Sequence, residues 1–74
     1  MIEVEFNLNL ALRMGKERQT FDIGESISLP QLEARLGLAA GEVGILLINK
    51  DWAPLDSIIK DGDLVQLYPF MEGG

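Results

Sequence analysis

The sequence of 74 residues contains neither cysteine nor histidine. Without cysteine the chain forms no disulfide, has no thiolate nucleophile and cannot hold an iron–sulfur cluster, and without either residue it lacks the usual zinc ligands. Histidine is also the commonest general base of enzymes. Carboxylates alone can still bind Mg²⁺ or Ca²⁺, but no pattern in the sequence indicates this, so we expect no metal site.

Positive charge and long apolar runs are also scarce. The sequence has six lysine and arginine residues and twelve aspartate and glutamate residues, which gives a net charge of −6. Such a surface repels phosphate backbones, so we expect no nucleic-acid partner, although a partner with a basic face would fit. The apolar run at 45–48 is far too short for a membrane span, and the first residues do not resemble a signal peptide. We therefore expect a cytoplasmic protein.

The first third of the chain predicts a β-hairpin. Residues 2–10 alternate between apolar and polar side chains, as in a strand with one buried face and one solvent-facing face. A turn at 14–17 and a second strand at 17–23 complete the hairpin. On the solvent-facing side of the first strand, Glu3 and Glu5 serve solubility or, in a sharper interpretation, docking of a basic partner.

A short helix follows the hairpin. Ser28 and Gln31 have the spacing of a capping box, and Gly37 is a natural C-cap. The helix has one apolar stripe and is so short that it must pack on the sheet to be stable. The residues of the stripe are Leu29, Leu32 and Leu36.

A buried strand and an irregular segment come next. The apolar run within 44–49 predicts a strand that is buried on both faces. Residues 52–59 predict an irregular segment with a short edge strand or a 3₁₀ turn. Within it, we expect Trp52 to fill part of the small core, which is the commoner role of an aromatic residue in such a segment.

The last strand is framed by two local signals. Asp61-Gly62-Asp63 is typical of a turn in which carboxylates bind backbone N–H groups, an interpretation favoured over a metal-binding or catalytic role. The strand itself spans 64–68, and Pro69 ends its ladder because proline has no backbone donor. The order of the elements predicts an α+β fold with a helix on one face of a sheet.

The sequence ends in Gly73-Gly74. Glycines add nothing to a core and are costly to order. An extended Gly-Gly end can, however, thread a narrow channel in another enzyme and present its carboxylate there, which any Cβ atom would obstruct. A frayed terminus that happens to contain glycine is the alternative.

The run at 61–69, Asp-Gly-Asp-Leu-Val-Gln-Leu-Tyr-Pro, together with Gly73-Gly74, resembles the sulfur carriers of molybdopterin and thiamine biosynthesis. Residues 45–49 resemble the penultimate strand and turn of that family, and elsewhere the similarity rests on the order of elements. The resemblance implies a ubiquitin-like β-grasp fold, with a mixed sheet of four to five strands packed on one short helix. It implies a domain at 1–69 and a flexible C-terminal tail at 70–74.

The resemblance also implies a mechanism in which the chain is a co-substrate and not an enzyme. A ubiquitin-activating-type enzyme uses ATP to adenylate the carboxylate of Gly74. Sulfur from a persulfide donor then displaces AMP, a thiol cleaves the S–S bond of the acyl disulfide and forms a disulfide with the donor, and the released thiocarboxylate delivers the sulfur to a synthase. The synthase would be of the molybdopterin synthase large-subunit type or the thiazole synthase type. The chain itself is expected to bind no cofactor, because its partners supply the chemistry.

The residues before the glycines bear on the partners. The Tyr68-Pro69 step is similar to the molybdopterin-type carrier, which favours that pathway over the thiamine type, whereas Phe70 and Glu72 depart from its pattern. We expect Phe70, Met71 and Tyr68 to contact the partner, because an aromatic residue and a flexible methionine suit an adaptable apolar surface. Phe70 and Met71 folded back on the sheet edge are the alternative. The residues expected to enter the partner's channel are Gly74, Gly73 and Glu72.

Two further interpretations remain open. The chain can be a ubiquitin-like modifier joined to target proteins through Gly74, because sulfur carriage and conjugation both begin with adenylation. It can also be an interaction module in which the glycines are accidental. A β-grasp ferredoxin or another enzyme is excluded by the missing cysteine and histidine.

Overall fold

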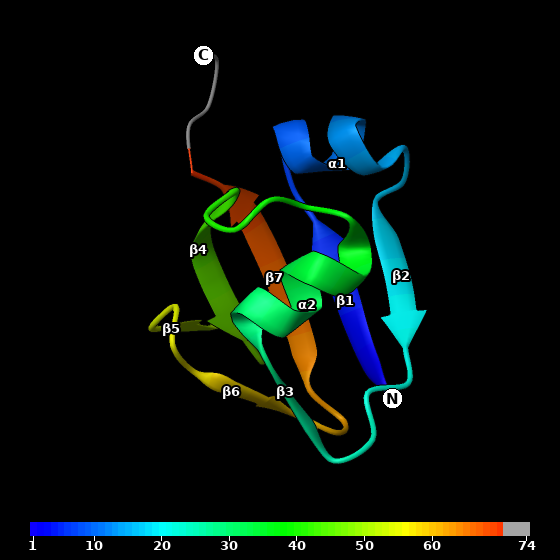
Figure 1. The fold of residues 1–74 in the computed structure, drawn as a ribbon, viewed down its shortest axis with the longest axis vertical. Coiled ribbons are helices and arrows are strands. Elements are labelled where there is room, and N and C mark those ends of the chain that lie inside the picture. The colour runs from blue at the N-terminus through cyan, green and yellow to red at the C-terminus, as the bar shows by residue number, and fades with distance from the viewer. Residues whose placement is uncertain (71–74) are drawn as a thin grey trace.

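The computed structural model describes residues 1–70, which contain a five-stranded mixed sheet, a two-stranded sheet and two short helices (Figure 1). In the larger sheet the strand order is β2-β1-β7-β4-β5, with β1 and β7 parallel and the other neighbours antiparallel. This is the β-grasp arrangement that the resemblance implied. The strands of this sheet are β1 (Ile2–Phe6), β2 (Arg18–Phe21), β4 (Val43–Ile48), β5 (Asp51–Ala53) and β7 (Leu64–Pro69).

The core lies between the sheet and helix α2 (Leu29–Leu36), which crosses one face of the sheet (Figure 1). Val4 of β1 and Leu32 of α2 are completely buried there. Val65 and Leu67 of β7 are buried on the same face, as the alternating pattern predicts. Burial of these side chains is the main favourable term that holds so short a helix on the sheet.

The predicted caps of α2 are confirmed. The Ser28 hydroxyl accepts the backbone N–H of Gln31 at 3.3 Å, and the Gln31 side-chain oxygen accepts the N–H of Ser28 at 3.0 Å. At the other end, Gly37 adopts a left-handed conformation with φ 79°. Leu29 and Leu32 of the apolar stripe are buried, and Leu36 is partly buried.

The segment before α2 forms a strand that the sequence pattern did not predict. β3 (Ser26–Ser28) pairs antiparallel with β6 (Ile58–Lys60) and makes the smaller sheet. The predicted irregular segment at 52–59 thus contains part of two edge strands, β5 and β6. Three-residue strands carry too few alternating positions to be read from one sequence.

The prediction of a strand over 2–10 is wrong beyond Phe6. Leu8 takes φ 57°, which turns the backbone out of the strand, and helix α1 (Asn9–Met14) follows. Leu10 is still buried, but from the helix, whereas Leu8 is 57% exposed. The alternation of leucines across the junction is therefore a coincidence of two different elements, and the fold has a second helix. Gly15, with φ 73°, caps α1 within the predicted turn at 14–17.

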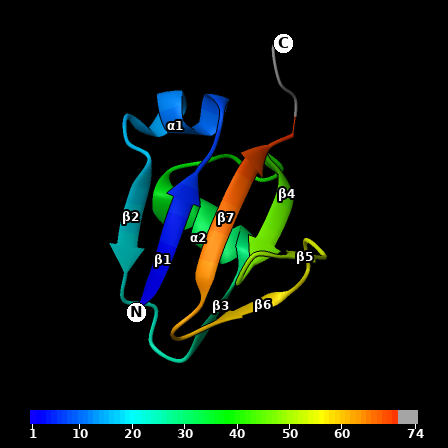
Figure 2. The same cartoon turned by 180° about the vertical axis from the view of Figure 1, so that it is seen from behind.

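The predictions for 44–49 and Trp52 also need correction. β4 is buried on one face only, through residues such as Leu46, while Ile45 and Leu47 are partly exposed on the other. Trp52 pairs with Leu47 across the strands and is 75% exposed, so it lies outside the core. Figure 2 views this outer face of the sheet, with α2 behind it, and neither helix within 1–70 covers it. Apolar side chains on β4 and β5 consequently face solvent.

Across residues 1–70, the helices are too short and too polar to serve as membrane-crossing segments.

Candidate functional site at the C-terminal end of β7

The predicted site residues divide between the described and the undescribed parts of the chain. Tyr68 lies on the outer face of β7, and Phe70 follows the strand with its side chain 69% exposed. Within the described chain, Phe70 thus does not fold back onto the sheet edge. The expectations for Met71, Glu72, Gly73 and Gly74 fall outside the described residues, as does most of the predicted tail at 70–74.

The chain leaves β7 through a close backbone contact with β4. β7 includes Pro69, which pairs with Val43, so the strand extends one residue beyond the predicted end at 68. The backbone N–H of Phe70 then donates to the carbonyl oxygen of Glu42 at 2.8 Å. A Cβ atom at Gly44 would overlap the Cα atom of Phe70, so this approach requires glycine. We call this region, made of Glu42, Gly44 and Phe70, the tail exit.

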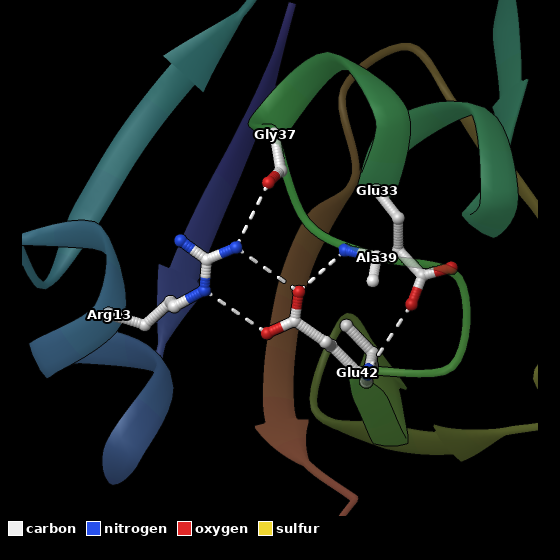
Figure 3. Close-up of polar contacts among 6 residues, drawn as sticks. Arg13, Glu33, Gly37, Ala39 and Glu42 are labelled. Carbon is white, nitrogen blue, oxygen red and sulfur yellow. Dashed lines mark hydrogen bonds and ion pairs between the residues drawn. The ribbon is translucent and has the colours of Figure 1, made fainter.

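The side chain of Glu42 is the centre of a hydrogen-bond cluster beside the tail exit (Figure 3). Its two oxygens accept Nε and Nη2 of Arg13, at 3.2 and 3.3 Å, in the fork geometry that arginine and carboxylate favour. The backbone N–H of Ala39 donates to the same carboxylate at 2.5 Å. Arg13 also donates to the Gly37 carbonyl at 3.1 Å. The Ala39 N–H and Arg13 together hold the pKa of Glu42 below its usual value.

A second carboxylate binds the backbone at the end of the same loop. Glu33 of α2 is only 4% exposed, and it accepts the backbone N–H of Val43 at 3.2 Å (Figure 3). This bond satisfies the first residue of β4, where the bulge between Val43 and Ile45 interrupts the regular pairing. The passage from α2 to β4 is thus fixed by two glutamates, one buried and one near the surface.

Helix α1 completes the surroundings of the tail exit. A hollow of about 320 Å³ lies between α1, the Glu42 loop and the end of β7. Sequence reasoning missed this contribution of α1, because the helix itself was not predicted. The signal available was Arg13 followed by Gly15, a basic last turn and a glycine cap typical of a helix end. The hollow is lined by Asn9, Leu10, Arg13, Glu42, Pro69 and Phe70.

The outer face of the sheet carries an apolar depression of about 370 Å³ next to the tail exit. Tyr68 faces Ile45 across the β7–β4 pair, and Leu47 faces Trp52 across the β4–β5 pair. These four residues line the depression, which we call the outer groove. Side chains of this size on an exposed sheet face are characteristic of a surface that binds another protein.

The other half of the outer face is charged and largely paired. Arg18 of β2 lies 3.3 Å from Glu3 and 3.8 Å from Glu5. Gln66 of β7 donates to Glu5 at 3.0 Å and marks the border with the outer groove. Because Arg18 compensates both carboxylates in part, the acidic character of this half is weaker than the sequence alone indicates.

The turn at Asp61-Gly62-Asp63 is confirmed as a structural element. The Asp63 carboxylate accepts the backbone N–H of Lys60 at 2.8 Å and the side-chain amide of Asn49 at 3.0 Å. Gly62 adopts φ 90°, which favours glycine. Nowhere in residues 1–70 do three or more potential metal ligands cluster.

Solved structures with the same fold include proteins named for molybdopterin and thiamine biosynthesis. A putative molybdopterin converting factor, subunit 1, from Pyrococcus furiosus matches with a TM-score of 0.69 at 15% identity, over 95% of this chain and 97% of its own. SAMP1 from Haloferax volcanii matches with a TM-score of 0.69 at 21% identity, over 99% and 98%. Thiamine biosynthesis protein ThiS from Geobacter metallireducens matches with a TM-score of 0.55 at 28% identity, over 97% and 99%.

These matches confirm the predicted fold and the predicted resemblance to the ubiquitin-like proteins of molybdopterin and thiamine biosynthesis. No curated protein matches the chain. The model of the family described as Mut7-C ubiquitin matches residues 2–73, nearly the whole chain. The chain therefore belongs to the Mut7-C ubiquitin family.

Proposed function

We propose that the protein is a sulfur carrier whose Gly74 carboxylate is adenylated and then converted to a thiocarboxylate that donates sulfur in cofactor biosynthesis. The observation that carries the proposal is the Gly73-Gly74 pair in the sequence, which comes three residues after the last strand of a β-grasp sheet. A carboxylate is a poor acyl donor, and its adenylate makes AMP a leaving group that a sulfur nucleophile can displace. The carrier then needs no catalytic side chain of its own.

The partners follow from this chemistry. A ubiquitin-activating-type enzyme binds the ATP and adenylates Gly74, and the carrier holds no cofactor. A synthase then accepts the thiocarboxylate. The Tyr68-Pro69 step supports a molybdopterin-type synthase first and a thiazole synthase second. In both partners, Glu72 and Gly73 would occupy the channel that leads to the reacting Gly74.

The reach of the tail supports a docking site at the outer groove. The four residues after Phe70 extend the chain by at most ~14 Å, since an extended chain advances ~3.5 Å per residue. When Gly74 reaches the adenylation centre, the surface of the activating enzyme must therefore lie near the end of β7. The outer groove includes Tyr68, two residues before Phe70. We assign the groove to an apolar segment of the activating enzyme, with exposed Phe70 at the edge of the contact.

The test is ATP–pyrophosphate exchange catalysed by candidate activating enzymes of the native host. We expect exchange that depends on the carrier and is lost when Gly74 is deleted. A matched control is Lys16→Ala, which changes an exposed residue far from the tail in the sequence. Exchange that persists without Gly74 would contradict the proposal.

The second candidate function is conjugation to target proteins through the same Gly74. It is favoured by the likeness in fold to ubiquitin-like proteins, and it predicts covalent adducts that survive a denaturing gel. The carrier function predicts that exchange occurs without such adducts.

A further inference from the structure

The last backbone hydrogen bond of the described chain is the one from Phe70 to Glu42. Proline has no backbone donor, so Pro69 cannot donate a hydrogen bond at this end of β7. Within residues 1–70, Phe70 therefore supplies the sole backbone donor beyond Tyr68. The direction in which the chain leaves the sheet depends on where the carbonyl of Glu42 is held.

The carbonyl of Glu42 belongs to a loop that its own side chain closes. The Glu42 N–H donates to the Ala39 carbonyl at 3.1 Å, while the Ala39 N–H donates back to the Glu42 carboxylate. Gly41 within the loop has φ 89°, so the loop relies on a conformation that glycine permits. The carboxylate thus fixes the backbone of the residue that receives Phe70.

Arg13 ties this loop to a different part of the chain. Its guanidinium binds both oxygens of Glu42 and also the Gly37 carbonyl at the end of α2 (Figure 3). Arg13 lies in the last turn of α1, which lines the hollow beside Pro69 and Phe70. The side chain of Arg13 thus connects α1 to the loop after α2 at the tail exit.

We propose that Arg13 and Glu42 are positioning residues whose ion pair sets the direction in which the chain leaves β7 at Phe70, and so aligns Gly74 for adenylation. The first part of this inference concerns the free protein alone. The second part rests on the proposed function. Both residues act through Phe70, because Glu42 accepts the Phe70 N–H at its carbonyl and Arg13 binds the Glu42 carboxylate.

Substitutions in the outer groove and in the Arg13–Glu42 pair should then have different effects on the kinetics of adenylation. The outer groove supplies binding, so a change there raises the KM for the carrier. The Arg13–Glu42 pair supplies alignment, so its loss reduces the fraction of bound carriers that present Gly74 correctly. A smaller fraction of correctly presented carriers lowers kcat, whereas KM stays nearly constant.

The first measurement is amide hydrogen exchange at Phe70, followed by NMR in the free protein. We expect amide exchange at Phe70 to be about fivefold faster in Glu42→Gln and in Arg13→Gln, because each variant weakens the hydrogen bonds that hold the Glu42 loop in place. The Asn49 amide, which donates to Leu64 at 2.7 Å at the opposite end of β7, should not change. Arg18→Gln is the matched control, because it removes an exposed arginine that pairs with two glutamates away from the tail exit.

The second measurement is the rate of adenylation at several carrier concentrations. Glu42→Gln and Arg13→Gln should lower kcat about fivefold with KM unchanged, and Arg18→Gln should change neither. Arg13→Lys keeps the charge but loses the two-pronged contact, so it should fall between the wild type and Arg13→Gln.

The outcomes are distinguishable. Unchanged Phe70 exchange in both glutamine variants would overturn the inference, and so would faster exchange with an unchanged kcat. If the wild-type protein is not adenylated at all, the proposed function fails, and the exchange measurement alone then decides whether the ion pair fixes the chain at Phe70.

Discussion

Each end of β7 is held by a carboxylate that accepts hydrogen bonds, but the two ends differ in which parts of the chain these bonds connect. At the start of the strand, the Asp63 carboxylate accepts the N–H of Lys60 and the side chain of Asn49. At its end, the Glu42 carboxylate accepts the N–H of Ala39 and the side chain of Arg13. In each case a carboxylate closes a turn and binds one side chain from elsewhere.

The difference lies in what each end secures. Asn49 also accepts the N–H of Leu64, and its own N–H donates to the Leu64 carbonyl, so the first end is part of the pairing between strands. At the second end, the Glu42 cluster lies at the surface, and within residues 1–70 the backbone of Glu42 is bonded to the chain that leaves β7 through the N–H of Phe70. We expect the Asp63 cluster at the first end to contribute mainly to stability, and the Glu42 cluster at the second end to contribute mainly to the direction of the chain at Phe70.

The largest expected effect comes from closing the space at the second end. Gly44→Ala places a Cβ atom on the Cα of Phe70, so either β4 or the tail exit must shift. We expect the free energy of unfolding to fall by about 1–3 kcal/mol, as for overpacking elsewhere. Chemical denaturation measures this loss. Unchanged stability together with an unchanged Phe70 amide shift would show that the contact is not tight.

Opening the first end should cost somewhat less. Asp63→Ala leaves the Lys60 N–H and the Asn49 amide without their acceptor, with an expected loss of about 1–2 kcal/mol. Asp63→Asn retains one acceptor oxygen and should lose less. Adenylation by the folded fraction should remain normal in both variants. A reduced kcat at full folding would contradict the division between the two ends.

A substitution in the outer groove tests partner binding near the C-terminal end of β7 without changing the Glu42 cluster. Trp52→Ala should raise the KM for the carrier about tenfold, because an exposed tryptophan in a docking surface contributes heavily to affinity. Since its side chain is 75% exposed, thermal stability should hardly change. Leu12→Ala is a matched control, an apolar side chain 80% exposed on α1. Equal effects of both changes would count against a specific groove.

The smallest expected effect is a pH dependence of the tail exit. The Ala39 N–H and Arg13 lower the pKa of Glu42 below its usual value, so its charged form is favoured in the folded state. The stabilisation is present above the unfolded pKa and is lost as the pH falls through the lower, folded pKa. Glu33, which binds the Val43 N–H in the same loop, is the other carboxylate there.

The amide chemical shift of Phe70 reports this titration. It should follow a transition whose midpoint in the wild type lies below the usual value for glutamate. The transition should disappear in Glu42→Gln. A midpoint at or above the usual value for glutamate would contradict the account of the cluster.

Sequence reasoning predicted the elements whose signals are local. The capping box at Ser28 and the turn at Asp61-Gly62-Asp63 depend on residues within a few positions of one another, and both are confirmed. The alternation in β7 also predicted its buried face correctly. These patterns carry their own geometry, so one sequence suffices.

The candidate site was less predictable because it depends on distant contacts. Arg13 and Glu42 are 29 positions apart, and no local pattern joins them. Trp52 was assigned to the core because nothing in the sequence shows which sheet face lacks a helix. The leucines at 8 and 10 continued the period of β1 by chance and concealed α1.

The central claim is that sulfur is carried on Gly74, and an intact-mass measurement after thiol alkylation tests it most directly. The carrier is treated with the activating enzyme, ATP and a sulfur donor, and then with a thiol-selective reagent. Because the chain has no cysteine, any adduct at neutral pH reports a thiocarboxylate and is not confused with methionine oxidation. The account predicts one adduct that maps to Gly74 and is lost when Gly74 is deleted. No adduct with any activating enzyme of the native host would contradict it.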